Sequence, residues 1–278
     1  MGNVDLGKVS FFVLDEADRM LDMGFHEDIL SIAKLLPANC QTIMFSATMP
    51  NKIEELARTI LKNPATIKLA VSKPAEKIKQ LACVCHENQK NGVLRSIFKT
   101  YGQKRVIIFS SSKLKVKEIN KYLKSVKINS GEMHSDLMQS QRDEVMYLFK
   151  SGQIDVLVAT DIVARGIDID DISMVINYDV PHDSEDYVHR IGRTARADHD
   201  GIAVTLVRGK EISMFMQIEK FLGYEVEKMP LPKGLGKAPE YKVTEHGNNN
   251  RRRNKRNGKY KGKGKFKKKG DKPKEPRK

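Results

Sequence analysis

Short apolar runs alternate along the chain with segments of helical spacing, and this alternation constrains the fold more than any other feature. The runs are SFFVL, QTIMF, QLACVC, RVIIF, DVLVA, SMVINY and GIAVTLV. Segments such as HEDILSIAKLL and QRDEVMYLF lie between most of them and carry apolar residues three and four positions apart. Strands and helices that alternate in this way predict an α/β fold, with parallel sheets that helices cover.

A change of composition divides the chain into parts. The stretch AVSKPAEKIKQ, residues 70–80, has the proline and lysine content of a linker. The preceding part, 1–69, offers two convincing strands, whereas a three-layer α/β domain usually needs roughly 100 to 200 residues. We therefore expect 1–69 to be the back half of a domain, with an open sheet edge, and 81–230 to be a domain that folds by itself.

The positive charge is concentrated near the carboxyl end. Of the formal net charge of +15, residues 251–278 hold 16 Lys and Arg against two acids, which gives +14 and leaves +1 for the first 250 residues. This end of the chain has too few apolar side chains to offset the entropy cost of ordering it. We therefore expect 231–278 to be a disordered basic tail. Two interpretations stay open, a solvated, solubilising tail and a tether for a polyanion.

The cysteines and the hydropathy pattern indicate where such a chain works. Cys40, Cys83 and Cys85 are too few for a disulfide framework, and Cys83 and Cys85 lack the second pair that a structural zinc site needs. Alternation instead places those two on one face of a strand. No apolar stretch approaches the roughly 20 residues of a membrane-spanning helix, and no signal peptide opens the chain. These features predict a reducing, cytoplasmic setting.

Three carboxylates follow the first apolar run in FFVLDEADRM, namely Asp15, Glu16 and Asp18. One interpretation is a helix start, because acidic side chains in a first turn interact favourably with its unpaired N–H groups. The other is a phosphate and metal site, because a strand buried on both faces would end here, and ligands of open α/β sheets bind beyond the carboxyl ends of strands. The residues alone leave both interpretations open.

Polar clusters also follow three later apolar runs. Ser46 and Thr48 follow TIMF, Ser110 to Ser112 follow VIIF, and Thr160 with Asp161 follows VLVA. Each cluster alone is typical of a helix cap or a Ser/Thr turn. Their repetition at corresponding sheet positions favours a functional site.

The segment YVHRIGRTARA carries the strongest signal. His189, Arg193 and Arg196 are spaced i, i+4 and i+7, so on one helix they would share a face. The plain alternative is a basic, solvated helix face. An arginine pair aimed at a neighbouring domain is, however, what phosphoryl transfer uses to stabilise charge on the γ-phosphate.

The chain contains four motifs in the order DEAD, SAT, ATDIVARGID and HRIGRTAR. In these motifs and their order it resembles DEAD-box ATP-dependent RNA helicases of superfamily 2. The linker wording VSKPAEKIKQ and the basic tail resemble the bacterial RhlE-like branch. The resemblance implies RecA-like parallel sheets flanked by helices, with a partial first lobe in 1–69 and a complete second helicase lobe in 81–230. It further implies unwinding or remodelling of short RNA duplexes, coupled to hydrolysis of ATP with Mg²⁺.

The resemblance also implies a role for each matching position. Asp15 would hold the Mg²⁺ of the nucleotide, and Glu16 would orient or deprotonate the attacking water. RNA would be gripped by its sugar-phosphate backbone, with little base specificity. The remaining assignments are Asp18, Ser46, Thr48 and His189 for coupling the ATP state to lobe closure, Gly166 and Asp168 for the nucleotide, Arg193 and Arg196 as arginine fingers, and Ser112, Gln139, Arg142, Thr160, Asp161 and Arg165 for RNA.

One implied motif is missing from the sequence. No G-x-x-x-x-G-K-[ST] loop occurs, because each Gly-Lys pair is followed by a residue other than Ser or Thr, and 14 residues precede DEAD. We therefore expect a fragment of a longer protein that lacks ATP turnover by itself. RNA is the expected partner, a membrane is not, and ribosome-assembly or RNA-decay complexes stay open. The alternative function is a non-catalytic RNA-binding module, and a DNA-directed motor is disfavoured by the wording of DEAD and SAT.

Overall fold

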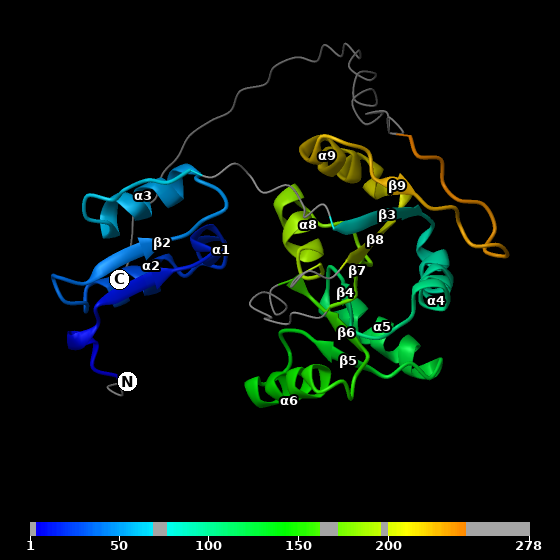
Figure 1. Ribbon diagram of the computed structural model, residues 1–278, viewed down its shortest axis with the longest axis horizontal. Coiled ribbons are helices and arrows are strands. Elements are labelled where there is room, and N and C mark those ends of the chain that lie inside the picture. Colours follow the sequence, from blue (N-terminus) through cyan, green and yellow to red (C-terminus); the bar gives the residue numbers. More distant parts are fainter. Residues whose placement is uncertain (1–3, 69–76, 162–171, 196–199, 243–278) are drawn as a thin grey trace, which may run out of the picture. The chain divides into compact units, whose positions relative to one another are not determined.

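The structure, a computed structural model, describes residues 4–68, 77–161, 172–195 and 200–242. These residues form a two-stranded sheet and a seven-stranded sheet, in which all neighbouring strands are parallel (Figure 1). Every apolar run that was expected to be a strand is one. The prediction of a parallel α/β fold is therefore confirmed, and the two sheets are described in turn.

The smaller sheet pairs β1 (Phe11–Leu14) with β2 (Gln41–Met44). A 3₁₀ turn, η1 (Leu6–Lys8), precedes it, and α1 (Ala17–Asp22), α2 (His26–Ala33) and α3 (Asn51–Ile60) follow its strands. Leu14 packs with apolar residues of all three helices, among them Ala17, Ile29 and Ile53. These helices cover the face of the sheet that carries Leu14.

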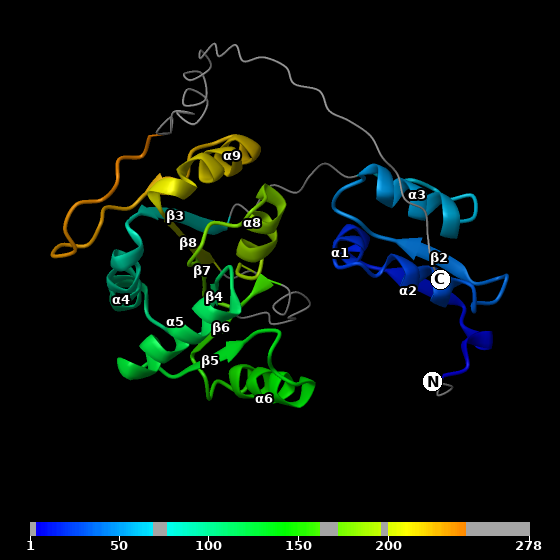
Figure 2. The ribbon, with the colours of Figure 1, turned by 180° about the vertical axis from the view of Figure 1, so that it is seen from behind.

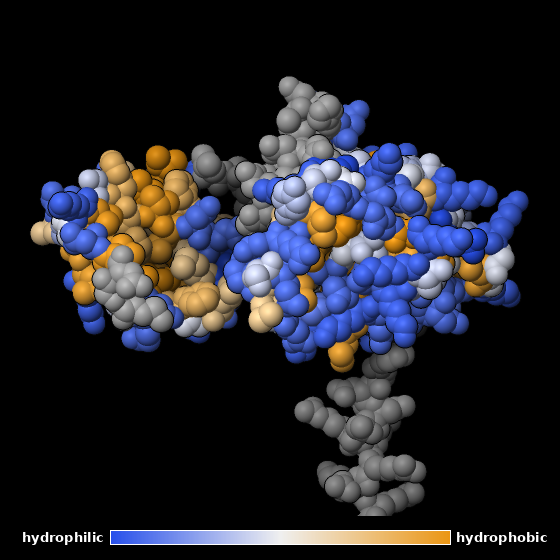
Figure 3. Space-filling model, turned by 90° about the horizontal axis from the view of Figure 1, so that it is seen from below, coloured by the Kyte–Doolittle hydropathy of each residue, from blue (hydrophilic) through white to orange (hydrophobic). Residues whose placement is uncertain are grey.

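The expectation that β1 is buried on both faces is wrong. Phe11 is 63% exposed and Val13 is 52% exposed, whereas Phe12 and Leu14 belong to the core cluster. Strand alternation turns Phe11 and Val13 to one face, whereas α1, α2 and α3 all pack on the other face, which carries Leu14. Hydrophobic residues accordingly make up much of the surface of this part in Figure 3.

The larger sheet has the strand order β5-β6-β4-β7-β8-β3-β9. Its strands and helices, in chain order, are β3 (Ile78–Val84), η2 (Glu87–Gln89), α4 (Lys90–Tyr101), β4 (Val106–Phe109), α5 (Lys113–Ser125), β5 (Ser130–Met133), α6 (Gln139–Lys150), β6 (Val156–Ala159), β7 (Met174–Asn177), α8 (Ser184–Ile191), β8 (Gly201–Val207), η3 (Gly209–Glu211), α9 (Ile212–Leu222) and β9 (Glu227–Lys228).

Helices cover both faces of this sheet (Figures 1 and 2). In β4, Val106 and Ile108 pack with α4 and α5, whereas Ile107 and Phe109 pack with Phe149 of α6. Helices α8 and α9 pack on the alternate residues of β3 and β8. A strand buried on both faces reads as a continuous apolar run, which is why VIIF and VLVA were recognisable in the sequence.

Two boundaries differ from those expected. Ile78, placed in the linker, is the first residue of β3. Leu235, placed in the disordered tail, packs onto the core, and Gln89 Nε2 donates hydrogen bonds to the carbonyls of Leu235 and Lys237 at 2.7 and 3.0 Å. The expectation of disorder is therefore wrong at these positions, because the segment carries apolar side chains that the core accepts. No helix within the described ranges is both long and apolar enough to cross a membrane.

Candidate functional site

Asp15 and Glu16 lie in the turn between the carboxyl end of β1 and α1. Asp15 is exposed and Glu16 is half-buried, and Asp15 Oδ1 accepts a hydrogen bond from the Glu16 N–H at 2.9 Å. Glu16 has a φ of 50°, a left-handed conformation that costs a non-glycine residue roughly 1–2 kcal/mol. The Ala17 N–H donates to the Phe45 carbonyl at 3.0 Å and holds the turn against the end of β2. The turn thus keeps both carboxylates outside the core.

Asp18 lies in the first turn of α1, as the helix-start interpretation predicts, but its carboxylate binds the loop after β2. Its Oδ2 accepts hydrogen bonds from Thr48 N–H at 3.0 Å and from Thr48 Oγ1 at 2.9 Å. Ser46 Oγ accepts from the Asp18 N–H at 3.3 Å and donates to the Thr48 carbonyl at 2.7 Å. Asp18 is 6% exposed. The DEAD and SAT motifs are therefore joined by one closed set of hydrogen bonds.

The same contacts set the protonation of Asp18. Burial disfavours the charged carboxylate, but the hydrogen bonds from Thr48, Arg19 and Ser46 favour it more, so the pKa of Asp18 lies below its ordinary value. Because the folded-state pKa is the lower one, the charged group contributes stability above its unfolded-state pKa of about 3.9. That contribution is lost as the pH falls through the folded-state pKa.

Replacing Thr48 by Val removes one donor to Asp18 and keeps the side-chain shape. A hydrogen bond to a charged group contributes about 1.5–3 kcal/mol, so we expect denaturant unfolding to show a loss of about 1.5 kcal/mol. NMR titration should show a higher pKa for the Asp18 carboxyl. The matched control is Thr59→Val, whose hydroxyl donates to the Glu55 carbonyl at 2.8 Å on the exposed side of α3. An unchanged Asp18 pKa in Thr48→Val would contradict this description of the cluster.

Two residues predicted to contact RNA lie at the carboxyl ends of β4 and β6, which are neighbours in the larger sheet. Ser112 caps α5, and its Oγ accepts a hydrogen bond from the Lys115 N–H at 3.3 Å. The Thr160 N–H donates to the Met133 carbonyl at the end of β5 at 3.2 Å. The cap interpretation of Ser112 is confirmed. The cap places the Ser112 hydroxyl at the carboxyl-terminal edge of the sheet, where the strands end and where Thr160 also lies.

Two further residues predicted to contact RNA lie on α6, which follows β5. Gln139 is the first residue of the helix, and its Nε2 donates to Asp143 Oδ1 at 2.9 Å. Arg142 Nη2 donates to the Ser135 carbonyl at 3.3 Å. The amino end of α6 thus adds an amide and a guanidinium group to the edge that β4, β5 and β6 form.

Arg190 is a site residue that the sequence did not single out. It is buried, and its Nε and Nη2 donate to the two carboxylate oxygens of Asp161 at 2.6 and 2.7 Å. Its Nη1 donates to the Asp179 carbonyl at 3.0 Å and to Asn177 Oδ1 at 3.3 Å. A bidentate pair fixes orientation as well as distance. Arg190 therefore joins the loop after β6 to the helix that carries His189.

The expectation that a single helix carries His189, Arg193 and Arg196 is wrong. Helix α8 ends at Ile191, and Gly192 follows as its cap. Arg193 lies in the turn beyond the helix, and its Nε donates to the His189 carbonyl at 3.3 Å. His189 and Arg193 are therefore near each other, but a turn and not a helical face brings them together.

Thr194 explains where the helix ends. It forms an isolated parallel bridge with Ile172, and its Oγ1 donates to the Ile172 carbonyl. Gly201 lies so close that a Cβ there would come within 2.5 Å of Thr194 Oγ1. Glycine at position 201 allows this close approach. The bridge with Ile172 requires an extended backbone at Thr194, so the helix ends before this residue.

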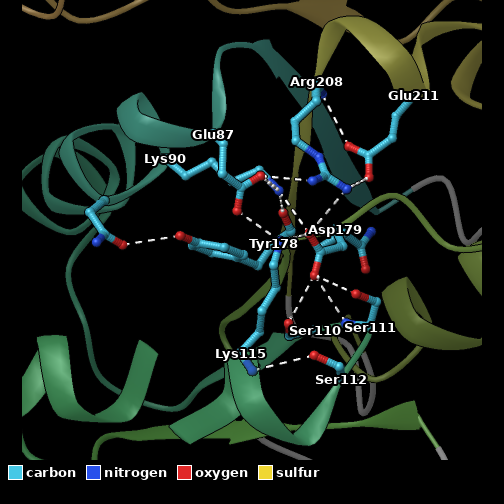
Figure 4. Close-up of polar contacts among 12 residues, drawn as sticks. Glu87, Lys90, Ser110, Ser111, Ser112, Lys115, Tyr178, Asp179, Arg208 and Glu211 are labelled. Atoms are coloured by element: carbon cyan, nitrogen blue, oxygen red, sulfur yellow. Dashed lines mark hydrogen bonds and ion pairs between the residues drawn. The ribbon is translucent and has the colours of Figure 1, made fainter. Parts of the chain in front are cut away.

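Asp179 is the centre of a polar network at the carboxyl end of β7 (Figure 4). Its Oδ1 lies 2.8 Å from Lys90 Nζ and 3.1 Å from Lys115 Nζ. Its Oδ2 accepts from Ser110 Oγ at 2.9 Å and from the N–H and Oγ of Ser111, both at 3.0 Å. Asp179 therefore fixes the serine loop that leads to the cap of α5.

A second group of charges, Glu87, Arg208 and Glu211, lies beside Asp179 in Figure 4. Glu87 lies 2.7 Å from Lys115 Nζ and 2.9 Å from Arg208 Nη1, and Arg208 also pairs with Glu211. Burial disfavours the charged form of Asp179, but the Lys90 ammonium and the Ser111 N–H favour it more, so the pKa of Asp179 lies far below its ordinary value. None of these partners was apparent from the sequence.

Four predicted residues, Arg165, Gly166, Asp168 and Arg196, lie outside the residues that the structure describes. The part that is described contains no group of three or more His, Cys, Asp or Glu side chains that could hold a metal ion. Asp15 nevertheless fits a Mg²⁺ site, because it is an exposed oxygen ligand, and Mg²⁺ is usually bound by one or two carboxylates together with substrate phosphates.

Two known protein families match parts of the chain. The family described as "DEAD/DEAH box helicase" matches residues 1–56, and the "Helicase conserved C-terminal domain" matches 89–198. One solved structure that resembles the chain is Escherichia coli DEAD-box protein SrmB bound to regulator of ribonuclease activity A. The two sequences are 30% identical and the TM-score is 0.53. The alignment covers 96% of the solved chain and 58% of this chain. This chain belongs to the DEAD-box helicase family.

Two further relatives bear on the function of this DEAD-box protein. It is 39% identical over 232 residues to "ATP-dependent RNA helicase DbpA" of Bacillus subtilis. The aligned region covers 83% of this chain and 48% of that relative. The solved structure of Saccharomyces cerevisiae Dbp5 bound to RNA and ADP BeF3 is 34% identical, has a TM-score of 0.73, and aligns with 81% of the chain and 61% of the solved one. The chain thus spans about half the length of the curated relative DbpA. The RecA-like fold is confirmed, whereas the RhlE-like branch and the division of the chain into two lobes stay predictions.

Proposed function

We propose that this DEAD-box protein acts in the ATP-dependent unwinding or remodelling of short RNA duplexes. The observation that carries the proposal is the turn after β1, which keeps Asp15 and Glu16 outside the core while Asp18 is bound to Ser46 and Thr48. Phosphoryl transfer depends on positioned groups of this kind, a carboxylate for the metal and another for the attacking water.

In this proposal Asp15 holds Mg²⁺ and Glu16 orients or deprotonates the water. Mg²⁺ bound with ATP supplies positive charge beside the phosphates. Asp18, Ser46 and Thr48 respond as one unit, because a shift of any of them breaks a shared hydrogen bond. The turn after α8 supplies Arg193, and the further roles proposed are coupling for His189, nucleotide contacts for Gly166 and Asp168, and a second arginine finger for Arg196.

The RNA side of the proposal rests on the edge that β4, β5 and β6 form. Hydroxyl, amide and guanidinium groups suit contacts with phosphate and ribose, which position a strand without reading its bases. The RNA bound in the Dbp5 structure supports RNA as the ligand class. The residues proposed to contact it are Ser112, Gln139, Arg142, Thr160, Asp161 and Arg165. Ribosome-assembly or RNA-decay complexes are proposed as the setting.

The chain of 278 residues is expected to hydrolyse ATP negligibly by itself. The physical reason is that its sequence contains no Gly-Lys-Ser/Thr loop whose N–H groups could cradle the phosphates. Phosphate release should be measured at saturating ATP, with and without RNA, for the chain and for its Glu16→Gln variant. Turnover in the chain that Glu16→Gln abolishes would refute this expectation.

A second candidate function is a non-catalytic RNA-binding module. It is favoured by the same missing loop and by the charge of +14 on residues 251–278. RNA binding that depends on salt but not on nucleotide would support it, and truncation after Asn250 should then flatten the dependence of affinity on salt. Competition between RNA and DNA of one sequence separates both candidates from a DNA-directed motor.

A further inference from the structure

Helix α5 carries lysines on a face that none of the proposed roles uses. Its sequence, KLKVKEINKYLKS, contains five lysines and one glutamate. Lys115 is directed to Asp179, whereas four lysines spaced i, i+4, i+8 and i+11 share an exposed face. We call these four the lysine stripe: Lys113, Lys117, Lys121 and Lys124.

The stripe carries more positive charge than its neighbours neutralise. Lys113 and Lys117 lie 2.6 and 2.9 Å from the two oxygens of Asp136, and their hydrogen bonds lower the pKa of that carboxyl to about 2. Within residues 4–68, 77–161, 172–195 and 200–242, the side-chain ammonium groups of Lys121 and Lys124 form neither a hydrogen bond nor an ion pair. Four ammonium groups therefore face one paired carboxylate.

The stripe is continuous with the proposed RNA edge. Lys113 directly follows Ser112, and Asp136 lies in the loop that leads to Gln139 at the start of α6. The Asp136 contacts thus hold the first half of the stripe against the element that carries Gln139 and Arg142. From there the stripe runs along α5 for about 16 Å, a length over which one strand of a duplex carries roughly five phosphates.

We propose that the lysine stripe binds the phosphate backbone of RNA that continues beyond the edge formed by Ser112, Gln139 and Arg142. This inference rests on the proposed function for the class of ligand. Lysine heads contact phosphates as point charges and carry no base preference, so the stripe extends the bound length of RNA without adding sequence specificity. The hydrophilic surface in Figure 3 includes the side of the larger part on which α5 and α6 lie.

The test compares two double variants of the full chain. Lys121→Gln with Lys124→Gln removes the unpaired half of the stripe. Lys99→Gln with Lys220→Gln is the matched control, because both are exposed lysines in the last turns of α4 and α9. The basic tail is present in every sample and cancels in the comparison. Affinities are measured from 50 to 200 mM salt for a short single-stranded RNA and for the same RNA with a single-stranded extension.

With the extended RNA, the stripe variant should show a salt slope about 1.4 smaller than that of the unaltered chain, since each lost single-strand phosphate contact removes about 0.7. Over this fourfold range of salt, the ratio of the two dissociation constants should change about sevenfold. The short RNA should bind with equal affinity to the stripe variant and to the unaltered chain. The control variant should bind either RNA with the affinity and salt slope of the unaltered chain.

Equal salt slopes for the stripe variant and the unaltered chain with the extended RNA would overturn the proposal, and so would an equal loss in the control variant. A failure of the proposed function gives a different result. In that case, Arg142→Gln would leave the affinity for the short RNA unchanged, whatever the extended RNA shows.

Discussion

Replacing Lys90 by Met is expected to lower the free energy of unfolding by about 3 kcal/mol. The Lys90 side chain is 0% exposed and that of Asp179 is 1% exposed, so the substitution leaves a buried carboxylate without its nearest cation. Breaking a buried pair on one side costs about 3–5 kcal/mol. The lower end applies because Lys115 Nζ stays within 3.1 Å of the same oxygen. Denaturant unfolding followed by far-UV circular dichroism measures the loss.

The matched control for Lys90→Met is Lys117→Gln. That side chain is 44% exposed and pairs with Asp136 in solvent, so its removal should cost less than about 1 kcal/mol. Equal losses for the two variants would show that the Asp179 network does not hold the larger part together. A second comparison adds Asp179→Asn to Lys90→Met, which should restore part of the lost stability, because no buried charge is then left unpaired.

The same network predicts how stability depends on pH. The folded-state pKa of Asp179 is lowered, so its charged form stabilises the fold above the unfolded-state pKa of about 3.9. That contribution is lost as the pH falls below this value towards the folded-state pKa. Between about pH 5 and pH 2, the unaltered chain should therefore lose more stability than Asp179→Asn.

Replacing Arg193 by Gln should lower ATP turnover about 10³-fold or more in a protein that joins this chain to a phosphate-binding segment. A guanidinium that stabilises charge on the transferred phosphoryl group is worth about 10³ to 10⁵ in kcat. Arg193→Lys should recover little of this, because an ammonium keeps the charge but lacks the planar fork. The observable is single-turnover phosphate release with RNA present.

Arg95→Gln provides the control for this substitution, since Arg95 is an exposed arginine on α4, away from the proposed site. If Arg193→Gln changed turnover only as much as Arg95→Gln, the turn after α8 would have no part in phosphoryl transfer. The effect should appear in kcat more than in KM, because the charge that Arg193 is proposed to stabilise develops in the transition state.

Much of the fold could be predicted because central parallel strands read as apolar runs. β5 was missed because its sequence, SGEM, is short and polar. Gly131 in that strand admits close packing, since a Cβ there would come within 2.9 Å of Ile154. α4 is hard to recognise in the sequence, because its first residues, KNG, interrupt the helical pattern before Val93 and Leu94.

The site was predictable where its residues follow strands. Asp15, Glu16, Ser46 and Thr48 all lie within four residues of the carboxyl end of β1 or β2, and these ends are neighbours because Leu14 pairs with Met44. The supporting partners could not be found in this way. Asp161 and Arg190 are 29 positions apart, and Lys90 and Asp179 are 89 apart, so only the folded chain shows these pairs. The end of α8 was missed because Thr194 binds a carbonyl from a distant segment.

Control of ATP hydrolysis by RNA is the property that distinguishes the proposed helicase from a plain RNA-binding module. This chain should be joined to an amino-terminal segment that carries a Gly-Lys-Thr loop, and phosphate release should be measured with and without single-stranded RNA. We expect RNA to raise the rate and Glu16→Gln to abolish hydrolysis in both conditions. Equal rates with and without RNA, in a protein that binds both ATP and RNA, would show that RNA does not control hydrolysis and would refute the proposed function.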